Sequence, residues 1–254
     1  MIFKTAKESH AHSLLTLEQL NNHYEFKISI DSILDIGCGV DLLDLRYWAN
    51  MEDELSTRSS GIPLNINCVG LDKVSIEQPE EKNIKIIKHD FNTEDGLGDL
   101  NNKFDVVWCH DVMQYSLSPI SFLNNCNSAM ADGGMLYVSV PTTFNVMHNK
   151  FENYTLSGSY NTFSITQIIY LLALNGFDIK DFHIRKEPYV DIIELITYKI
   201  SEPLDYNTSW YDLMEQKLLN INMEEIVFNK GYLTNIGLVT TWIDGNVYDY
   251  RYEN

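Results

Sequence analysis

A glycine turn with polar neighbours is the first feature of this sequence that could do chemistry. The apolar, β-type run Ser32–Ile36 ends abruptly in Gly37-Cys38-Gly39, and a helical stretch is expected from about Asp41 to Asn50. A strand that leads through glycines into a helix lets backbone N–H groups approach a bound ligand closely. Dinucleotide-binding units begin in the same way, so the turn alone does not identify the ligand.

Carboxylates follow the next β-type runs at positions where they could meet the same ligand. Asp72 comes at the end of the run Ile66–Leu71, where its carboxylate could accept both hydroxyls of a ribose. After the run Ile84–Lys88, Asp90 could bind an exocyclic amine and Phe91 could stack on a purine. In parallel sheets, ligands bind at the edge formed by the carboxyl ends of the strands.

These positions require strands that alternate with helices. Strands are expected at Ser32–Ile36, Ile66–Leu71, Ile84–Lys88, Asp105–Cys109, Met135–Val140, Phe177–Ile184 and Ile192–Lys199. Helices are expected at Asp41–Asn50, at Ile120–Met130, which closes on Asp132-Gly133-Gly134, and at Ser164–Asn175, which ends at Gly176. The alternation predicts an α/β fold with a largely parallel sheet covered on both faces. The closeness of the last two runs predicts a hairpin at one edge.

The rest of the chain is expected to pack on the same domain. We expect residues 1–31 to form an N-terminal helical cover, residues 32–200 the ligand-binding domain, and residues 201–254 a C-terminal appendage. The appendage would contain a helix from Trp210 to about Asn229 and a hairpin at Asp244-Gly245. A separate domain of this size would be marginal without disulfides or a metal.

Charge and cysteine content argue against several partners. The 254 residues carry 18 basic and 36 acidic side chains, a formal net charge of −18, so we expect neither nucleic acid nor an anionic membrane as a partner. The four cysteines form no CxxC pair, so neither a zinc site nor a disulfide framework is indicated, and no metal is expected. No secretory signal or membrane-spanning run is visible, so we expect the cytoplasm.

Taken in order, the glycine turn and the polar strand ends resemble the motifs of class I S-adenosylmethionine-dependent methyltransferases. The resemblance covers roughly Ser32 to Lys199 and implies a Rossmann-like fold with a seven-stranded, mostly parallel sheet and S-adenosylmethionine as the cofactor. The cofactor-binding positions that it implies are Asp35, Gly37, Cys38, Gly39, Asp41, Asp72, Lys73, Asp90, Phe91 and His110. Asp35 and the two glycines would hold the methionine end, and Asp72 would bind the ribose.

The chain is more closely similar to uncharacterised methyltransferases encoded by tailed phages of marine bacteria, a similarity that implies no substrate. The segments that carry it are Asp44–Ala49, Pro63–Ile66, Trp108–Ser116, Ile169–Phe177 and Trp210–Leu213. For a phage protein, the expected compartment is the cytoplasm of the host.

Two departures from the family pattern affect the cofactor site. Asp41 stands where the family often has a third glycine. Its carboxylate could cap the following helix, bind the amino group of the cofactor, or repel the carboxylate of the methionine moiety. The connection from Gly39 to Asp72 is also longer than a tight crossover needs, and its polar stretch Met51–Pro63 is either a lid or a surface loop.

Residues after the fourth and fifth strands are the candidates for the chemistry itself. Methyl transfer is an in-line displacement from an activated sulfonium, so an enzyme mainly positions the acceptor and excludes water. His110 could act as a general base with Asp111 orienting it, or both side chains could merely shape the methionine pocket. Tyr115, His148 and Tyr154 are expected in the acceptor pocket.

The predicted function is S-adenosylmethionine-dependent methyl transfer to an oxygen or nitrogen atom of an unknown acceptor, a small molecule or a protein. The Asn/Asp-Pro-Pro-Tyr motif of nucleobase methylation is absent where His110–Met113 follows the fourth strand. A non-catalytic S-adenosylmethionine-binding or interaction protein with a degenerate fold stays open as the alternative. A nicotinamide-dependent oxidoreductase would need a third glycine where Leu42 stands. The oligomeric state does not follow from the sequence.

Overall fold

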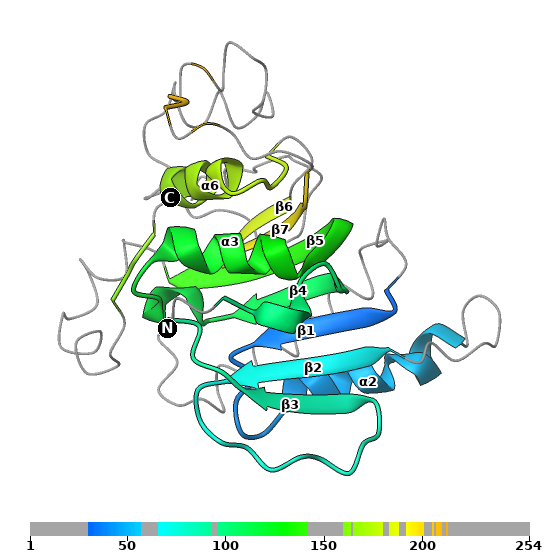
Figure 1. Cartoon of the computed structure of the whole chain (residues 1–254). Coiled ribbons are helices and arrows are strands. Elements are labelled where there is room, and N and C mark those ends of the chain that lie inside the picture. Colours follow the sequence, from blue (N-terminus) through cyan, green and yellow to red (C-terminus); the bar gives the residue numbers. More distant parts are fainter. Residues whose placement is uncertain are drawn as a thin grey trace, which may run out of the picture.

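The computed structural model describes residues 30–56, 66–92, 96–141, 160–163, 165–179, 183–187 and 192–200, together with residues 205, 207–209 and 212 (Figure 1). The predicted N-terminal cover lies outside these residues except for its last two positions. The predicted C-terminal helix and hairpin lie outside them except for Asp212. The described residues therefore fall almost entirely within the predicted ligand-binding domain.

A mixed sheet forms the centre of the molecule. Its strands are β1 (Ser32–Ile36), β2 (Asn67–Asp72), β3 (Ile84–Lys88), β4 (Phe104–His110), β5 (Met130–Pro141), β6 (His183–Glu187) and β7 (Ile192–Tyr198). They lie in the order β3-β2-β1-β4-β5-β7-β6. The pairs from β3 to β5 are parallel, whereas β7 runs antiparallel to both β5 and β6. The predicted α/β fold with parallel strands and an antiparallel hairpin at one edge is confirmed.

The order of the strands reverses at β1. From β1 the chain passes through helix α2 (Leu43–Ser56) to β2 on one side, and after β3 it returns to β4 on the other side. Asp35 of β1 is level with Gly70 of β2 and with Trp108 of β4. Open α/β sheets bind ligands outside the carboxyl ends of the strands at such a reversal. A ligand-binding site is therefore expected at the carboxyl ends of β1 and β4.

A carboxylate holds β1 and β4 together at their amino ends. The Oδ2 atom of Asp105 accepts hydrogen bonds from the N–H groups of Asp31 and Ser32, both at 2.9 Å, and from the Ser32 hydroxyl at 2.8 Å. The N–H of Asp105 donates in return to Oγ of Ser32 at 3.1 Å. These bonds join segments that are 73 and 74 positions apart in the chain.

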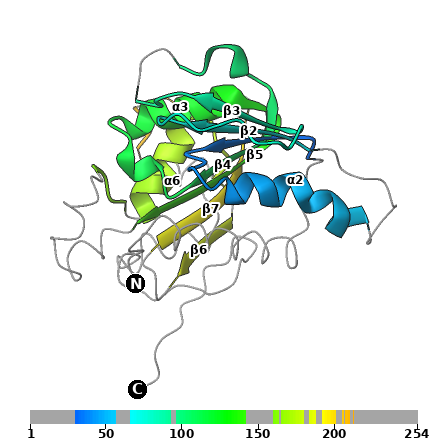
Figure 2. The same cartoon turned by 90° about the horizontal axis from the view of Figure 1, so that it is seen from below.

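Helices cover both faces of the sheet. Helix α2 lies on one face, and helices α3 (Pro119–Ala129) and α6 (Ile165–Leu174) lie on the other (Figure 2). Because side chains alternate along a strand, Leu34 packs in the core that contains α3 and α6, whereas its neighbour Ile33 packs with Leu45 and Trp48 of α2. None of the described helices is long and apolar enough to cross a membrane.

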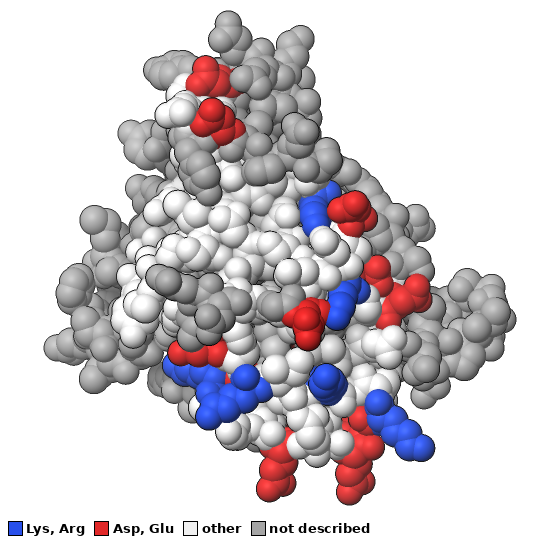
Figure 3. Space-filling view, in the orientation of Figure 1, with Lys and Arg blue, Asp and Glu red and all other residues white. Residues whose placement is uncertain are grey.

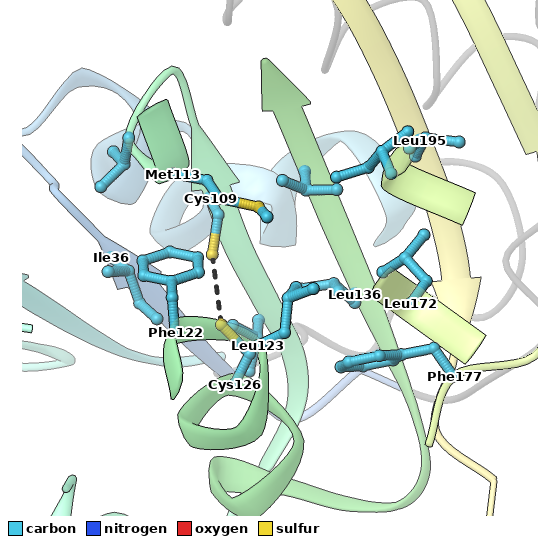
Figure 4. Packing of buried hydrophobic residues seen from close by; sticks show 14 of the residues in the cluster. Ile36, Cys109, Met113, Phe122, Leu123, Cys126, Leu136, Leu172, Phe177 and Leu195 are labelled. Atoms are coloured by element: carbon cyan, nitrogen blue, oxygen red, sulfur yellow. Dashed lines mark hydrogen bonds between the residues drawn. The ribbon is translucent and has the colours of Figure 1, made fainter. Parts of the chain in front are cut away.

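Two cysteines meet in the core between α3 and the sheet. The Sγ atoms of Cys109 on β4 and Cys126 on α3 are 3.9 Å apart (Figure 4). Both side chains are buried free thiols. They pack among Met113, Phe122 and Leu123, so the middle of α3 lies directly on β4.

The predicted helix stop at Asp132-Gly133-Gly134 is wrong. Helix α3 ends at Ala129, and β5 begins at the next residue, so these three residues lie inside a strand. Pairing of Met130 with Phe104 of β4 draws this segment into the sheet. The register then shifts before Val106, and Gly133 adopts a φ of +73°. The glycines accommodate an irregularity in the strand.

The predicted strand Phe177–Ile184 is also misplaced. Gly176 ends α6 as predicted, with a φ of +79°. The N–H groups of Asn175 and Phe177 both donate to the carbonyl oxygen of Leu172, at 3.0 and 3.1 Å, so Phe177 belongs to the end of the helix. It makes an isolated bridge with Lys199, and β6 starts at His183.

Candidate functional site

The glycine turn after β1 lies between β2 and the segment that follows β4. The N–H groups of Gly37 and Cys38 both donate to the carbonyl oxygen of Leu71, at 2.7 and 3.1 Å. Gly37 has a φ of +79° and Gly39 a φ of +65°, a conformation that favours glycine. A Cβ atom on Gly37 would lie 2.3 Å from Cγ2 of Val112. The turn therefore needs glycine both for its backbone conformation and for space.

Asp72 joins this turn to the end of β2. Its Oδ2 accepts a hydrogen bond from the N–H of Gly39 at 3.1 Å, and its Oδ1 accepts one from the N–H of Val74 at 3.0 Å. An ionised carboxylate offers about four acceptor positions, so it can also accept hydrogen bonds from ligand hydroxyls. The structure thus brings two of the predicted cofactor-binding residues together.

Asp35 is a buried carboxylate beside the turn. Its side chain is 2% exposed, and its Oδ2 has no hydrogen-bond partner among the described residues. Burial raises the pKa of Asp35 well above its usual value, and the nearby carboxylates of Asp44 and Asp72 raise it further. A buried acceptor without a partner is costly, so this oxygen is suited to a cationic hydrogen-bond donor.

Asp44, in the first turn of α2, is a second buried carboxylate, which the motif pattern does not single out. It is 5% exposed, and its Oδ2 accepts a hydrogen bond from Nε1 of Trp108 at 3.1 Å. The Trp108 ring stacks on Tyr137 with ring centroids 3.6 Å apart, and it meets Trp48 edge-on. The sequence feature that could have indicated a buried carboxylate is the position of Asp44 inside the apolar run Leu42-Leu43-Asp44-Leu45.

Asp41 is exposed and lies before α2. The helix begins two residues later than predicted, so Leu42 directly precedes its first residue and Asp41 does not occupy the capping position. The carbonyl oxygen of Asp41 accepts a hydrogen bond from Nη1 of Arg46 at 3.2 Å. Helix α2 continues to Ser56, so the first part of the stretch Met51–Pro63, expected to be either a lid or a surface loop, is helical, and the rest lies outside the described residues.

The end of β4 places His110 and Asp111 beside β5. His110 is 7% exposed, and its ring is parallel to that of Tyr137 with centroids 6.1 Å apart. Asp111 has a φ of +57°, and its N–H donates to Oγ of Ser139 at 2.8 Å. Nε2 of Gln114 donates to Oδ1 of Asp111 at 2.5 Å. Gln114, which the sequence pattern does not select, therefore holds the Asp111 carboxylate.

The loops after β3 and β4 are tied to each other. Asp90 is exposed, and its Oδ1 accepts a hydrogen bond from the N–H of Asn92 at 3.0 Å. Phe91 is half-buried and packs edge-on against Phe122, with ring centroids 5.4 Å apart. Nδ2 of Asn92 donates to the carbonyl oxygen of Tyr115 at 3.3 Å. The residues predicted for adenine and acceptor binding therefore lie on connected loops.

The remaining predicted positions are of three kinds. Lys73 is exposed and follows Asp72. Cys38 is buried, and burial followed by the charge of Asp35 raises its pKa above the usual value of a thiol. His148 and Tyr154 lie outside the described residues. Within the ranges that the structure describes, no three His, Cys, Asp or Glu side chains gather in a way that could hold a metal ion.

Comparison with known proteins gives a family and a relative. A family model described as "Methyltransferase domain" matches residues 8–181 of this chain. The protein "Probable methyltransferase ltbC" from Aspergillus luteorubrus is 28% identical over 112 residues, which make up 42% of this chain and 38% of that protein. The match therefore spans well under half of the relative's length.

Solved structures share the fold. An S-adenosylmethionine-dependent methyltransferase from Mesorhizobium loti superposes with a TM-score of 0.53 at 13% identity, over 75% of this chain and 98% of that chain. The [4+2]-cyclase SpnF gives 0.52 at 13% identity, over 76% and 81% of the two chains. The CurJ carbon methyltransferase gives 0.51 at 12% identity, over 76% and 54%. At these identities the likeness shows the fold alone.

Proposed function

The chain belongs to the methyltransferase domain family, and on this premise we propose that it transfers the methyl group of S-adenosylmethionine to an oxygen or nitrogen atom of its acceptor. The acceptor is a small molecule or a protein rather than nucleic acid, because a chain with a net charge of −18 repels a phosphate backbone. The phage origin and the cytoplasmic location that the sequence implies stay predictions.

The observation that carries this proposal is the arrangement of Asp35, the glycine turn and Asp72. The buried Oδ2 of Asp35, which has no partner within the described ranges, suits the ammonium group of the methionine moiety, because a nearby cation stabilises the charged carboxylate. The Asp72 carboxylate, already oriented by Gly39, suits the hydroxyls of the ribose. Asp90 and Phe91, in the loop after β3, suit the adenine.

In this reaction the residues of the chain position the acceptor and bind the positive cofactor through nearby carboxylates. The sulfonium is already activated and positive, so carboxylates at the ends of β1 and β2 favour its binding. His110 would accept a proton where the acceptor must lose one. Asp111, fixed by Gln114, would orient the acceptor for in-line attack.

Calorimetric titration tests the cofactor. The purified chain should bind S-adenosylmethionine and S-adenosylhomocysteine with micromolar affinity, and it should not bind a nicotinamide dinucleotide under the same conditions. Failure to bind S-adenosylhomocysteine would overturn the proposal. Binding of the nicotinamide dinucleotide alone would identify an oxidoreductase instead.

Turnover needs its own measurement, because the fold alone does not imply methyl transfer: one chain that shares it is named as a [4+2]-cyclase. Transfer of tritium from S-adenosylmethionine labelled in its methyl group to an acceptor would support an enzyme. Tight cofactor binding without transfer to any acceptor offered would favour the alternative, a non-catalytic S-adenosylmethionine-binding protein.

A further inference from the structure

Gln114, three residues after Asp111, carries a buried acceptor atom. Its side chain is 2% exposed and lies in the short 3₁₀ helix Met113–Tyr115. Its Nε2 donates to both Oδ1 and the carbonyl oxygen of Asp111, at 2.5 and 2.8 Å, and these two bonds define which end of the amide is nitrogen. The Oε1 atom has no hydrogen-bond partner in the described part of the chain. This position therefore calls for a hydrogen-bond donor from outside these residues.

The edge of the sheet at which Gln114 lies is rich in carboxylates. Four of them lie within two residues of the carboxyl ends of β1 to β4, namely Asp35, Asp72, Asp90 and Asp111. Lys73 and Lys88 lie at the same edge but are exposed, and the Lys and Arg side chains visible in Figure 3 lie at the surface, mixed with acidic side chains. Arg46 is paired with Glu81 at 2.8 Å, and Lys199 lies 3.6 Å from Asp132. Such an edge attracts a cation and repels an anion.

We propose that the methyl acceptor is the nitrogen of a primary or secondary amine, whose N–H groups donate to Oε1 of Gln114 and to the carboxylate of Asp111. This inference rests on the function proposed above and names its substrate class. An amine is cationic before reaction and has enough N–H groups for both acceptors. A carboxylate or phosphate would be repelled by Asp111 and has no donor for Gln114. An alcohol has a single hydrogen and can satisfy one of the two.

The transfer balances with one proton released. The ammonium form of the acceptor first gives a proton to His110 or Asp111, which passes it to water. The freed lone pair on nitrogen forms a bond to the methyl carbon while the bond from that carbon to sulfur breaks, and its electron pair stays on sulfur. One ammonium ion and one sulfonium ion thus yield a methylated ammonium ion, a neutral thioether and a proton.

Chemical blocking of candidate acceptors tests this assignment. The full chain receives S-adenosylmethionine labelled in its methyl group and a cell extract divided by ultrafiltration into a small-molecule arm and a protein arm. Each arm is offered untreated, after acetylation of its amines, and after amidation of its carboxylates. Label should enter one arm and fall by about tenfold or more after acetylation, with little change after amidation. The arm that accepts label identifies the source of the amine.

Two negative results are distinguishable. Label that persists after acetylation, or that enters neither arm although S-adenosylhomocysteine binds, overturns the amine assignment alone. Failure of S-adenosylhomocysteine to bind in calorimetry overturns the proposed function itself.

A variant that removes the charge of Asp111 tests whether this carboxylate binds the amine. Asp111→Asn keeps the size of the side chain, and asparagine tolerates the left-handed backbone at this position, where φ is +57°. The KM for the amine should rise by about tenfold or more, while the affinity for S-adenosylhomocysteine stays within about twofold. Asp99→Asn, which removes an exposed carboxylate from the 3₁₀ helix Gly98–Leu100, is the matched control and should change neither value. An unchanged KM in Asp111→Asn overturns the proposal.

Discussion

Oδ2 of Asp72, the last residue of β2, accepts a hydrogen bond from the N–H of Gly39 in the turn after β1, at 3.1 Å. The two residues are 33 positions apart, so they meet only when β1 and β2 have paired. The carboxylate that suits the ribose therefore also shapes the turn that suits the methionine end. A substitution of Asp72 should therefore affect both the binding of the ribose and the conformation of the glycine turn.

Asp72→Ala should weaken the binding of S-adenosylhomocysteine by about 1.5–3 kcal/mol, the range for hydrogen bonds to a charged group, which is about tenfold to a hundredfold in Kd. Asp72→Asn keeps a side-chain oxygen that can accept the hydrogen bond from the N–H of Gly39, so its affinity for S-adenosylhomocysteine should fall less. Calorimetric titration of the three proteins measures the effect, with thermal unfolding as a check of folding. Equal affinities of the wild-type protein and Asp72→Ala would exclude this residue from the cofactor site.

Gly37→Ala should destabilise the fold by about 2–4 kcal/mol, because it adds the cost of a left-handed backbone to a steric overlap with Val112. Gly133→Ala is the matched control: its φ is also positive, at +73°, but a Cβ there would meet no atom within 4 Å. It should cost about 1–2 kcal/mol. Urea unfolding compares the two, and equal losses would contradict the overlap at Gly37.

The raised pKa of Asp35 should make stability depend on pH. The folded chain holds the Asp35 proton more tightly than the unfolded chain, in which this carboxyl titrates at about pH 4. The contribution of Asp35 to stability is therefore fully present below about pH 4 and is lost as the pH rises through the folded-state pKa. Asp35→Asn does not titrate.

The free energy of unfolding of Asp35→Asn, relative to that of the wild-type protein, should therefore increase with pH in this window, by up to about 1.4 kcal/mol per pH unit. Urea unfolding of both proteins between about pH 4 and pH 8 measures this difference. A difference that stays constant with pH would show that Asp35 titrates normally.

The four cysteines should be unreactive in the folded protein. All four are buried, and burial is the main cause that raises the pKa of Cys38, of Cys109 and of Cys68, the last to about 12. At pH 8 a thiol with such a pKa is a thiolate about one time in ten thousand. Iodoacetamide should thus label the native chain slowly and modify all four thiols after denaturation. Rapid labelling of any cysteine in the native chain would contradict its burial.

Features that depend on local pattern could be predicted from the sequence. β1 and β3 have the expected bounds, Ser32–Ile36 and Ile84–Lys88, because short apolar β-type runs there end at turn residues. The glycine turn and Gly176 were recognisable because a positive φ favours glycine. The helix stop at Gly133 was wrongly predicted for the same reason. A glycine that ends a helix and a glycine in an irregular strand cannot be distinguished by residue type, and only the pairing of β5 with β4 shows that Gly133 lies in a strand.

Two residues of the candidate site, Asp44 and Gln114, were not predicted from the sequence because their roles depend on tertiary packing. Asp44 and Trp108 are 64 positions apart, and their hydrogen bond exists because α2 packs against the face of β4 that carries the indole. Gln114 is close to Asp111 in sequence, but its amide reaches the carboxylate where Asp111 adopts a left-handed backbone, which its residue type does not predict. Strand ends can be located from sequence, whereas the partners that orient their side chains cannot.

The pairing of β1 with β4 sets when this protein can become functional during folding. Ile33 lies opposite Val106, and Asp105 binds Ser32 at the start of β1, 73 positions earlier in the chain, so this contact closes one of the longer loops in the chain. Sheets built from such distant parallel pairs fold slowly, typically in milliseconds to seconds. The proposed cofactor site, which needs the ends of both strands, would form late, after synthesis has passed β4. Until then the apolar strand β1 lacks its neighbour β4, and its unpaired edge is exposed to aggregation.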